Sequence, residues 1–198
     1  MKISEKLGLR TGDVVSVVGA GGKTTLIFRL ARELAELGSK VLVATTTRMY
    51  FPESTPCGVC FLSGEPDENG KATPHAGLGK ACGRFDYTLI EADGAKGKPL
   101  KGWADYEPVI IPETTKTVGV LNLGPLERGE RAAPENIHRP DEYARLTGSK
   151  PGDIITIGHM RAVVSDGMFK NAAGEKILCV VGAAKAYEFE GVDKCVIL

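Results

Sequence analysis

The sequence predicts an α/β fold built on a mainly parallel β-sheet. Short apolar runs rich in β-branched residues recur along the chain, and amphipathic helical segments lie between them. The runs are continuously apolar rather than alternating, which is typical of parallel strands covered on both faces. At 198 residues the chain is long enough for one sizeable core. We therefore expect one domain spanning residues 1–198.

The first predicted strand leads directly into a glycine-rich segment. Residues 14–18 are apolar apart from one serine, and Gly19-Ala20-Gly21-Gly22-Lys23-Thr24-Thr25 follows, ahead of a helical pattern. Strand, glycine loop and helix in this order are typical of a phosphate-binding P-loop. Glycines let successive N–H groups face an anion, and the helix N-terminus adds its positive dipole end. The sequence thus predicts a three-layer fold of the P-loop NTPase type that binds a nucleotide.

Each residue of this loop has an expected role. The nucleotide-binding set is Gly19, Ala20, Gly21, Gly22, Lys23, Thr24 and Thr25. Lys23 is expected to reach the terminal phosphates, and the Thr24 hydroxyl to bind Mg²⁺. Val17 stands where the full pattern G-x-x-x-x-G-K-[ST] begins, so the loop has the shorter form G-x-x-G-K-T-T of the Mur-type ligases. A glycine-rich turn without a ligand is the alternative.

A helix and a second strand follow the loop. The helix has Leu26, Ile27, Leu30, Leu34 and Leu37 on one face, and Gly38 is its expected end. The second strand covers residues 40–44 and runs into Thr45-Thr46-Thr47-Arg48. Ligands bind beyond the carboxyl ends of parallel strands. Thr46 and Arg48 are therefore substrate-binding candidates, with a strand end and an exposed arginine as the alternative.

Residues 52–86 are interrupted by prolines and glycines, with one strand-like run at 59–62. We interpret them as an inserted hairpin or lid. The segment contains Cys57, Cys60, His75 and Cys82. Their spacing is similar to that of a zinc site, but ordinary buried thiols are the favoured interpretation. The sequence leaves metal binding by these residues open.

The next apolar strand, at residues 87–93, ends in two acids. Alternation along the strand places Glu91 and Asp93 on the same face. An apolar strand ending in acids downstream of a P-loop is typical of a Walker B element. Asp93 together with Thr24 is expected to hold Mg²⁺, and Glu91 to orient or deprotonate the attacking group. Lys23, Glu91 and Asp93 form the expected catalytic set, and two exposed acids are the alternative.

Residues 94–103 combine three lysines with glycines at the same predicted edge. Lys96, nearest the acids, is the substrate-binding candidate, and a solvated loop is as good an interpretation for Lys98 and Lys101. Trp103 is expected to pack rather than stack on a base. The remaining expected strands cover residues 107–112, 117–121, 177–182 and 194–198, and the remaining expected helices cover 141–146 and 157–168.

Composition narrows the class of protein. Lys and Arg total 25, as do Asp and Glu, so no net charge favours nucleic acid or a membrane surface. No apolar run approaches the roughly 20 residues that span a bilayer, and residues 1–6 do not form a secretory signal. Five cysteines in such a chain indicate reduced thiols. We expect a cytoplasmic nucleotide-driven enzyme or factor.

Several segments together resemble a known family. They are Gly19–Thr25, Thr45–Tyr50, the Glu-Ala-Asp-Gly-Ala-Lys-Gly-Lys-Pro-Leu-Lys block at 91–101, and Ile137–Arg139. They resemble the selenium-dependent hydroxylase accessory proteins of the YqeC type. The resemblance implies a helper for molybdenum hydroxylases that carry a labile selenium, with such an enzyme or its cofactor as partner. It also makes His138 and Arg139 substrate-site candidates, and the Val181-Gly182 strand end favours ATP over GTP.

The sequence supports three functional hypotheses. The first is Mg²⁺-dependent hydrolysis of ATP, or phosphoryl transfer from it, coupled to maturation of a selenium-dependent molybdenum hydroxylase. The second is a nucleotide-switched assembly factor with slow hydrolysis, whose segments at 45–51 and 94–103 order around the γ-phosphate. The third is an ATP-dependent ligase, suggested by the short form of the glycine loop.

Overall fold

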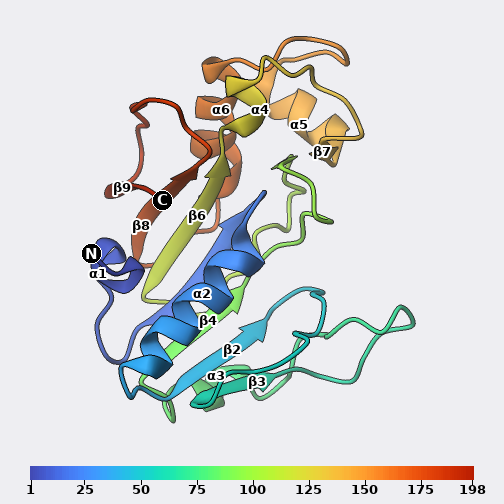
Figure 1. Cartoon of the computed structure of the whole chain (residues 1–198). Helices are drawn as coiled ribbons and strands as arrows, with labels where there is room; N and C mark the ends of the chain where they lie inside the picture. The colour runs from blue at the N-terminus through green and yellow to red at the C-terminus, as the bar shows by residue number, and fades with distance from the viewer.

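A computed structural model describes all residues, 1–198, and contains a seven-stranded sheet in which every neighbouring pair is parallel. The strand order is β3-β2-β4-β1-β6-β8-β9 (Figure 1). The bounds are β1 (Val14–Gly19), β2 (Val41–Thr45), β3 (Val59–Leu62), β4 (Tyr87–Glu91), β6 (Lys116–Asn122), β8 (Glu175–Val181) and β9 (Lys194–Ile197). The predicted α/β fold with a mainly parallel sheet is confirmed.

A second, two-stranded sheet and seven short or medium helices complete the chain. The small sheet pairs β5 (Leu100–Lys101) with β7 (Ile137–His138). The helices are α1 (Ile3–Leu7), α2 (Lys23–Glu36), α3 (Leu78–Cys82), α4 (Gly124–Glu127), α5 (Pro140–Thr147), α6 (Ile157–Val163) and a π-helical turn, η1 (Val164–Met168).

Side chains of β1 alternate between the two faces of the sheet, and this alternation divides the core. Val15 and Val17 pack in a cluster with α1 and α2. Val14 packs on the opposite face with α3, and Val18 with α5, α6 and η1. Helices therefore cover both faces of the sheet, which gives three layers (Figure 1).

Helix α2 follows the predicted pattern except at its last turn. Leu26, Ile27, Leu30 and Leu34 are buried against the sheet, as their spacing predicts. The helix ends at Glu36, Gly38 has a positive φ of 86°, and Leu37 caps the helix with 53% of its surface exposed. Leu37 thus lies beyond the buried stripe, because the chain already turns there toward β2.

The sheet topology differs from the inserted hairpin or lid that we predict at residues 52–86. Instead of forming a separate hairpin, β3 lies parallel to β2 and extends the main sheet at its edge. An isolated antiparallel bridge between Met49 and Ala72 and the short helix α3 hold the rest of the segment. A parallel neighbour needs a crossover between the strands, and the segment 46–58 supplies it.

The prediction that the thiols of this segment are buried is wrong for two of its three cysteines, because β3 lies at the edge of the sheet. Cys57 and Cys60 are exposed, whereas Cys82 is buried and its Sγ donates to the carbonyl oxygen of Leu78 at 3.3 Å. No group of three or more His, Cys, Asp or Glu residues in the chain is arranged to hold a metal ion.

Two other sequence predictions differ from the structure. Residues 107–112, predicted as a strand, contain none, because two prolines remove the N–H donors that a strand ladder requires. The strand-like segments that were missed are β5 and β7. The single helix predicted over 157–168 consists of α6 followed by the π-helical turn η1.

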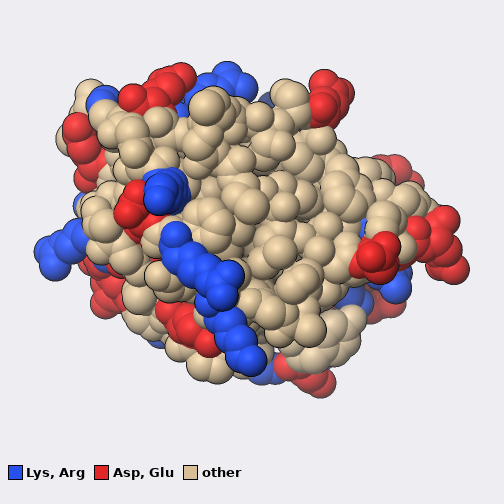
Figure 2. Space-filling view, turned by 90° about the horizontal axis from the view of Figure 1, so that it is seen from below, with Lys and Arg blue, Asp and Glu red and all other residues tan.

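No helix of this chain is long and apolar enough to cross a membrane. The face seen in Figure 2 has a broad uncharged area, and acidic and basic side chains are interspersed around it. A short continuous band of basic side chains also crosses this face (Figure 2).

Candidate functional site

The glycine loop lies at the carboxyl end of β1, in the middle of the sheet, and opens α2 (Figure 1). Gly19, Gly21 and Gly22 all have positive φ angles, of 105°, 72° and 149°. Between them, Ala20 is buried and its N–H donates to the carbonyl oxygen of Val120 at 3.1 Å. Only glycine adopts such a succession of backbone angles without strain. The loop therefore bends tightly between strand and helix, as a phosphate cradle requires.

We expect Gly19→Ala to lower the free energy of unfolding by roughly 3 kcal/mol, through backbone strain and a steric clash. A Cβ at Gly19 would lie 2.2 Å from the carbonyl oxygen of Val120 on β6. Gly12→Ala is the matched control, since Gly12 has a φ of 95° but nothing lies within 4 Å of its Cβ position. Equal losses in urea unfolding of the two variants would contradict the close approach between the loop and β6.

Asn122, at the end of β6, holds the loop from its other side. Its Nδ2 donates to the carbonyl oxygen of Gly21 at 3.3 Å, and its Oδ1 accepts from the N–H of Gly124 at 2.8 Å. Asn122 is not among the site residues predicted from the sequence. The one feature of the sequence that could have indicated this role is a polar side chain at the end of a buried parallel strand.

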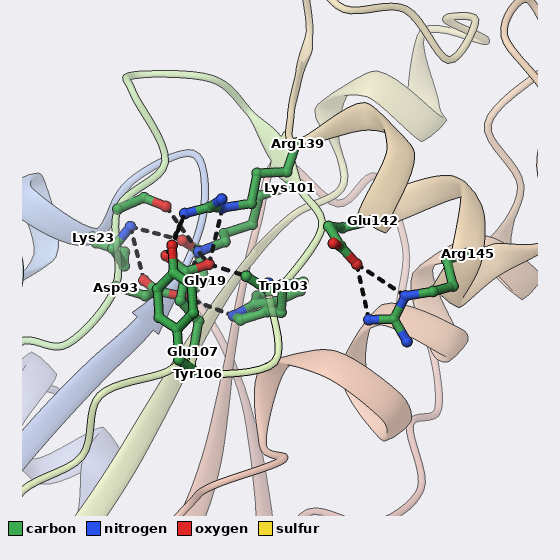
Figure 3. A network of polar contacts seen from close by, with 12 residues as sticks. Gly19, Lys23, Asp93, Lys101, Trp103, Tyr106, Glu107, Arg139, Glu142 and Arg145 are labelled. Atoms are coloured by element: carbon green, nitrogen blue, oxygen red, sulfur yellow. Dashed lines mark hydrogen bonds and ion pairs between the residues drawn. The ribbon is translucent and has the colours of Figure 1, made fainter.

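Lys23 is folded back onto the loop. Its Nζ donates to the carbonyl oxygen of Gly19 at 2.7 Å and lies 3.2 Å from Oδ1 of Asp93 (Figure 3). The side chain is only 5% exposed. A buried ammonium needs such partners, because burial without them is very unfavourable. Lys23 is thus beside the loop, with its charge compensated by Asp93.

Asp93 is fully buried and accepts hydrogen bonds from three residues. The N–H of Gly19 lies 3.0 Å from Oδ2, Nε1 of Trp103 donates at 2.8 Å, and Nζ of Lys101 at 3.1 Å. Burial alone would raise the pKa of Asp93, but Lys23, Lys101 and the Gly19 amide outweigh it and hold this pKa below its ordinary value. Asp93 is therefore a carboxylate whose oxygens are already used by protein donors.

Glu91 is the acid that faces the start of α2. Its Oε2 accepts from the hydroxyl of Thr24 at 2.7 Å. Burial raises the pKa of Glu91 despite the nearby Lys23 and the bond from Thr24. Thr24 itself is exposed, as is Thr25 beside it in the first turn of α2. The pair of Thr24 and Glu91 thus offers oxygen ligands to a hard cation at the solvent side of the loop.

Lys101 is the main residue that sequence reasoning misplaced. A solvated loop is as good an interpretation of the sequence as an anion-binding one at this position, but the side chain is completely buried. Its Nζ contacts Asp93, the carbonyl oxygen of Gly94 at 2.8 Å and Oε2 of Glu107 at 3.2 Å. Trp103 is buried beside it, as expected. No local sequence signal marks this burial, since it depends on the pairing of β5 with β7.

An arginine completes this cluster on the outer side. Nε of Arg139 lies 3.2 Å from Oε2 of Glu107, and its Nη2 donates to the hydroxyl of Tyr106 at 2.8 Å (Figure 3). The ion pairs thus run from Lys23 through Asp93, Lys101 and Glu107 to Arg139. Three cations face two carboxylates in this chain of contacts, so it carries a surplus positive charge.

Three predicted substrate residues lie around the same edge of the sheet with different partners. The hydroxyl of Thr46 donates to the carbonyl oxygen of Val109 at 2.7 Å, and its N–H donates to Glu91 O at 3.1 Å. Arg48 is 65% exposed and pairs with Asp67 at 3.4 Å. Lys96 is exposed. Thr46 is therefore attached to the acid-bearing strand, whereas Arg48 is engaged with the segment after β3.

His138 lies in β7, opposite Lys101 in the two-stranded sheet. Burial lowers the pKa of His138 to about 4, and Lys101, Arg139, Lys96 and Lys98 add to this effect. The imidazole is therefore neutral at pH 7.

This neutral histidine predicts an acid-sensitive contribution to stability. The unfolded chain takes up the His138 proton below pH 6.5, but the folded chain does so only below about 4. Between these values the unfolded state binds more protons, so the free energy of unfolding falls as the pH decreases. His138→Gln should reduce this slope in urea unfolding between pH 6.5 and 4.5. An unchanged slope would contradict a neutral, half-buried His138.

Comparison with known proteins agrees with these sequence features. A family model described as "YqeC protein" matches residues 15–141, which include the glycine loop, both acids and Arg139. A protein of Escherichia coli (strain K12), curated as "Uncharacterized protein YqeC", is 35% identical over 184 aligned residues, covering 80% of this chain and 70% of that protein. No solved structure matches significantly. The chain belongs to the YqeC family.

Proposed function

We propose that this protein binds a nucleotide with Mg²⁺ at the glycine loop and hydrolyses it or transfers its terminal phosphoryl group. ATP is the proposed nucleotide. The main observation behind this proposal is the glycine loop, whose glycines have positive φ angles. The loop joins a central parallel strand to a 14-residue helix, and Lys23 lies next to it. The helix dipole, the free amides of the first turn and one lysine together favour a polyphosphate. On this basis we propose that the chain is of the P-loop NTPase type.

Lys23 has to exchange partners in this scheme. In the structure its ammonium group contacts Gly19 O and Asp93. Turning it toward a phosphate leaves Asp93 with the donors Gly19, Lys101 and Trp103. Asp93 therefore keeps a compensated charge when Lys23 moves, and we assign it a positioning role behind the loop.

Thr24 and Glu91 are the proposed holders of Mg²⁺. A hydroxyl and a carboxylate 2.7 Å apart at the first turn of α2 have the donor chemistry that Mg²⁺ prefers. Bound there, Mg²⁺ would neutralise charge on the phosphate oxygens. This assignment moves the acidic ligand from Asp93 to Glu91, since the oxygens of Asp93 already accept bonds from protein donors. Catalysis then consists largely of positioning and electrostatic stabilisation.

Thr24→Ala tests this site against a neighbouring threonine. We expect it to weaken the Mg²⁺ dependence of ATP turnover and lower the rate by about 10²-fold, as is typical for loss of a positioned polar group. Thr25→Ala, next to it in the same exposed turn, is expected to keep the normal Mg²⁺ requirement. Turnover assayed across a Mg²⁺ titration measures both. If both variants keep the normal dependence of turnover on Mg²⁺, Thr24 is not part of the metal site.

For the physiological role, we propose an accessory function in maturation of selenium-dependent molybdenum hydroxylases. The support is the resemblance of the segments at 19–25, 45–50, 91–101 and 137–139 to that type of protein. Adding a purified hydroxylase or its molybdenum cofactor to the turnover assay tests this role. An increase in turnover with either one supports the accessory role, and unchanged turnover with both opposes it.

One observation favours a second candidate, a nucleotide-switched assembly factor with slow hydrolysis. Lys101 connects Asp93 behind the glycine loop to Gly94 and Glu107 in the following segment. Movement of Lys23 on nucleotide binding would therefore change the contacts of residues 94–107. Limited proteolysis of this segment with and without nucleotide separates the two functions. Turnover that rises only with a partner protein favours the switch.

A further inference from the structure

The small sheet brings one more polar side chain to the candidate site. Its register pairs Lys101 with His138. Paired residues of neighbouring strands project from the same face of a sheet. Since Lys101 reaches Asp93 beneath the glycine loop, the His138 imidazole lies on the side of the small sheet that faces the same cluster.

His138 differs from the other two histidines in its bonding. Nδ1 of His75 accepts from the N–H of Gly77 at 2.9 Å, and Nδ1 of His159 accepts from the N–H of Thr156. The His138 side chain has no hydrogen-bond partner in the chain. A neutral imidazole has one donor and one acceptor nitrogen. Both nitrogens of His138 are therefore available to a ligand.

Four cations act on this imidazole. They are Lys101, Arg139, Lys96 and Lys98. Two of them are already used: Lys101 by Asp93 and Glu107, and Lys98 by the carbonyl oxygens of Pro134 and Ile137.

The other two cations have donors to spare. Lys96 is exposed and pairs with no acid, and Arg139 contacts Glu107 and Tyr106 through Nε and Nη2 only, which leaves Nη1 free. An ammonium and a guanidinium with free donors thus act on the His138 imidazole, whose own nitrogens are also free.

Backbone strain occurs at the same two residues. Lys96 and Arg139, with φ angles of 49° and 57°, are the only non-glycine residues of the chain in the left-handed region. Such conformations are unfavourable for residues with a Cβ and persist where the surrounding structure imposes them. The fold thus imposes the backbone conformation of both cations, one ahead of β5 and the other directly after β7.

We propose that Lys96, His138 and Arg139 form a binding site for the second substrate, a small molecule that carries a phosphate or carboxylate group. A guanidinium and an ammonium would bind its oxyanion, and the neutral imidazole would donate an additional N–H. The proposal rests on the nucleotide-dependent reaction proposed above, since it supplies the acceptor or co-substrate of that reaction. Neighbouring ion pairs place this site next to the glycine loop.

The test follows the three histidine ring signals by NMR in the full chain, with the glycine loop saturated by MgADP. Inorganic phosphate and acetate are the two probes, and they separate a phosphate-bearing substrate from a carboxylate-bearing one. We expect saturable shifts of the His138 signals, assigned with His138→Gln, while His75 and His159 stay unchanged. Lys96→Ala should weaken the apparent Kd about 10-fold. Lys150→Ala, which removes another exposed lysine, should leave it unchanged.

Two results would overturn the proposal. The first is that neither probe shifts His138 more than His159. The second is that Lys23→Ala, and not Lys96→Ala, weakens the effect, since the probe would then be in the glycine loop. Failure of the nucleotide proposal shows separately, as backbone amides of Gly21 and Gly22 that do not respond to MgADP.

Discussion

Lys23→Ala is expected to abolish ATP turnover, with a loss of at least roughly 10²-fold, because it removes the cation nearest the proposed phosphate position. The same change should weaken binding of MgATP, measured by calorimetry. The fold should persist, since Lys101, Trp103 and Gly19 still bond to Asp93. A ligand that binds only the folded state raises the unfolding midpoint. Thermal unfolding with and without MgATP therefore reports binding and integrity together.

Lys150→Ala is the matched control, since Lys150 is an exposed lysine in a turn whose side chain has no ion-pair partner. It should retain normal turnover and the normal shift of the midpoint with MgATP. Near-normal turnover by the folded Lys23→Ala variant would remove the glycine loop from the mechanism. Repeating the thermal measurement with GTP and CTP tests the choice of ATP.

Glu91→Gln is expected to change activity and stability in opposite directions. The amide keeps an oxygen to accept the Thr24 hydroxyl but lacks the charge that would hold Mg²⁺, so turnover should fall by roughly 10²–10³-fold. At neutral pH the free energy of unfolding should rise, because a buried carboxylate no longer has to be kept charged. Opposed effects of this kind are typical of functional acids.

The pH dependence of this gain follows from the raised pKa of Glu91. In the unfolded chain Glu91 loses its proton near the ordinary value of 4.5, but in the folded chain it does so at higher pH. The folded state therefore binds more protons in this window, and the wild-type protein loses stability as the pH rises through it.

The Glu91→Gln variant lacks this loss, so the two proteins should be closest in stability at acid pH and furthest apart at neutral pH. Urea unfolding at several pH values measures the difference. A gain that is independent of pH would contradict a Glu91 pKa raised by burial.

Much of the architecture could be predicted because local patterns determine it. Continuous apolar runs located β2, β4, β6 and β8, and Gly38, with its left-handed backbone, marked the end of α2. The glycine loop was recognisable because strand, glycines and helix are consecutive. The edge strand β3 was located as a strand, but its partner was not, since parallel pairing depends on contacts distant in sequence.

The polar cluster beneath the loop could not be derived in the same way. Lys101 belongs to a basic, glycine-rich stretch, and only the pairing of β5 with β7 turns it inward. Glu107 lies in a segment predicted as a strand and becomes an ionic partner only through the tertiary fold. Asp93 and Glu91 are two residues apart, but one is surrounded by protein donors and the other faces Thr24. Local sequence does not distinguish these environments.

The most direct measurement is a crystal structure with a non-hydrolysable ATP analogue and Mn²⁺ in place of Mg²⁺, in which anomalous scattering locates the metal. We predict phosphate oxygens on the amides of Gly21, Gly22 and Lys23, with the metal beside Thr24 and Glu91. We also predict that Asp93 still bonds to Lys101 and Trp103. A glycine loop without phosphate, or a metal bound by Asp93 instead of Glu91, would contradict these predictions.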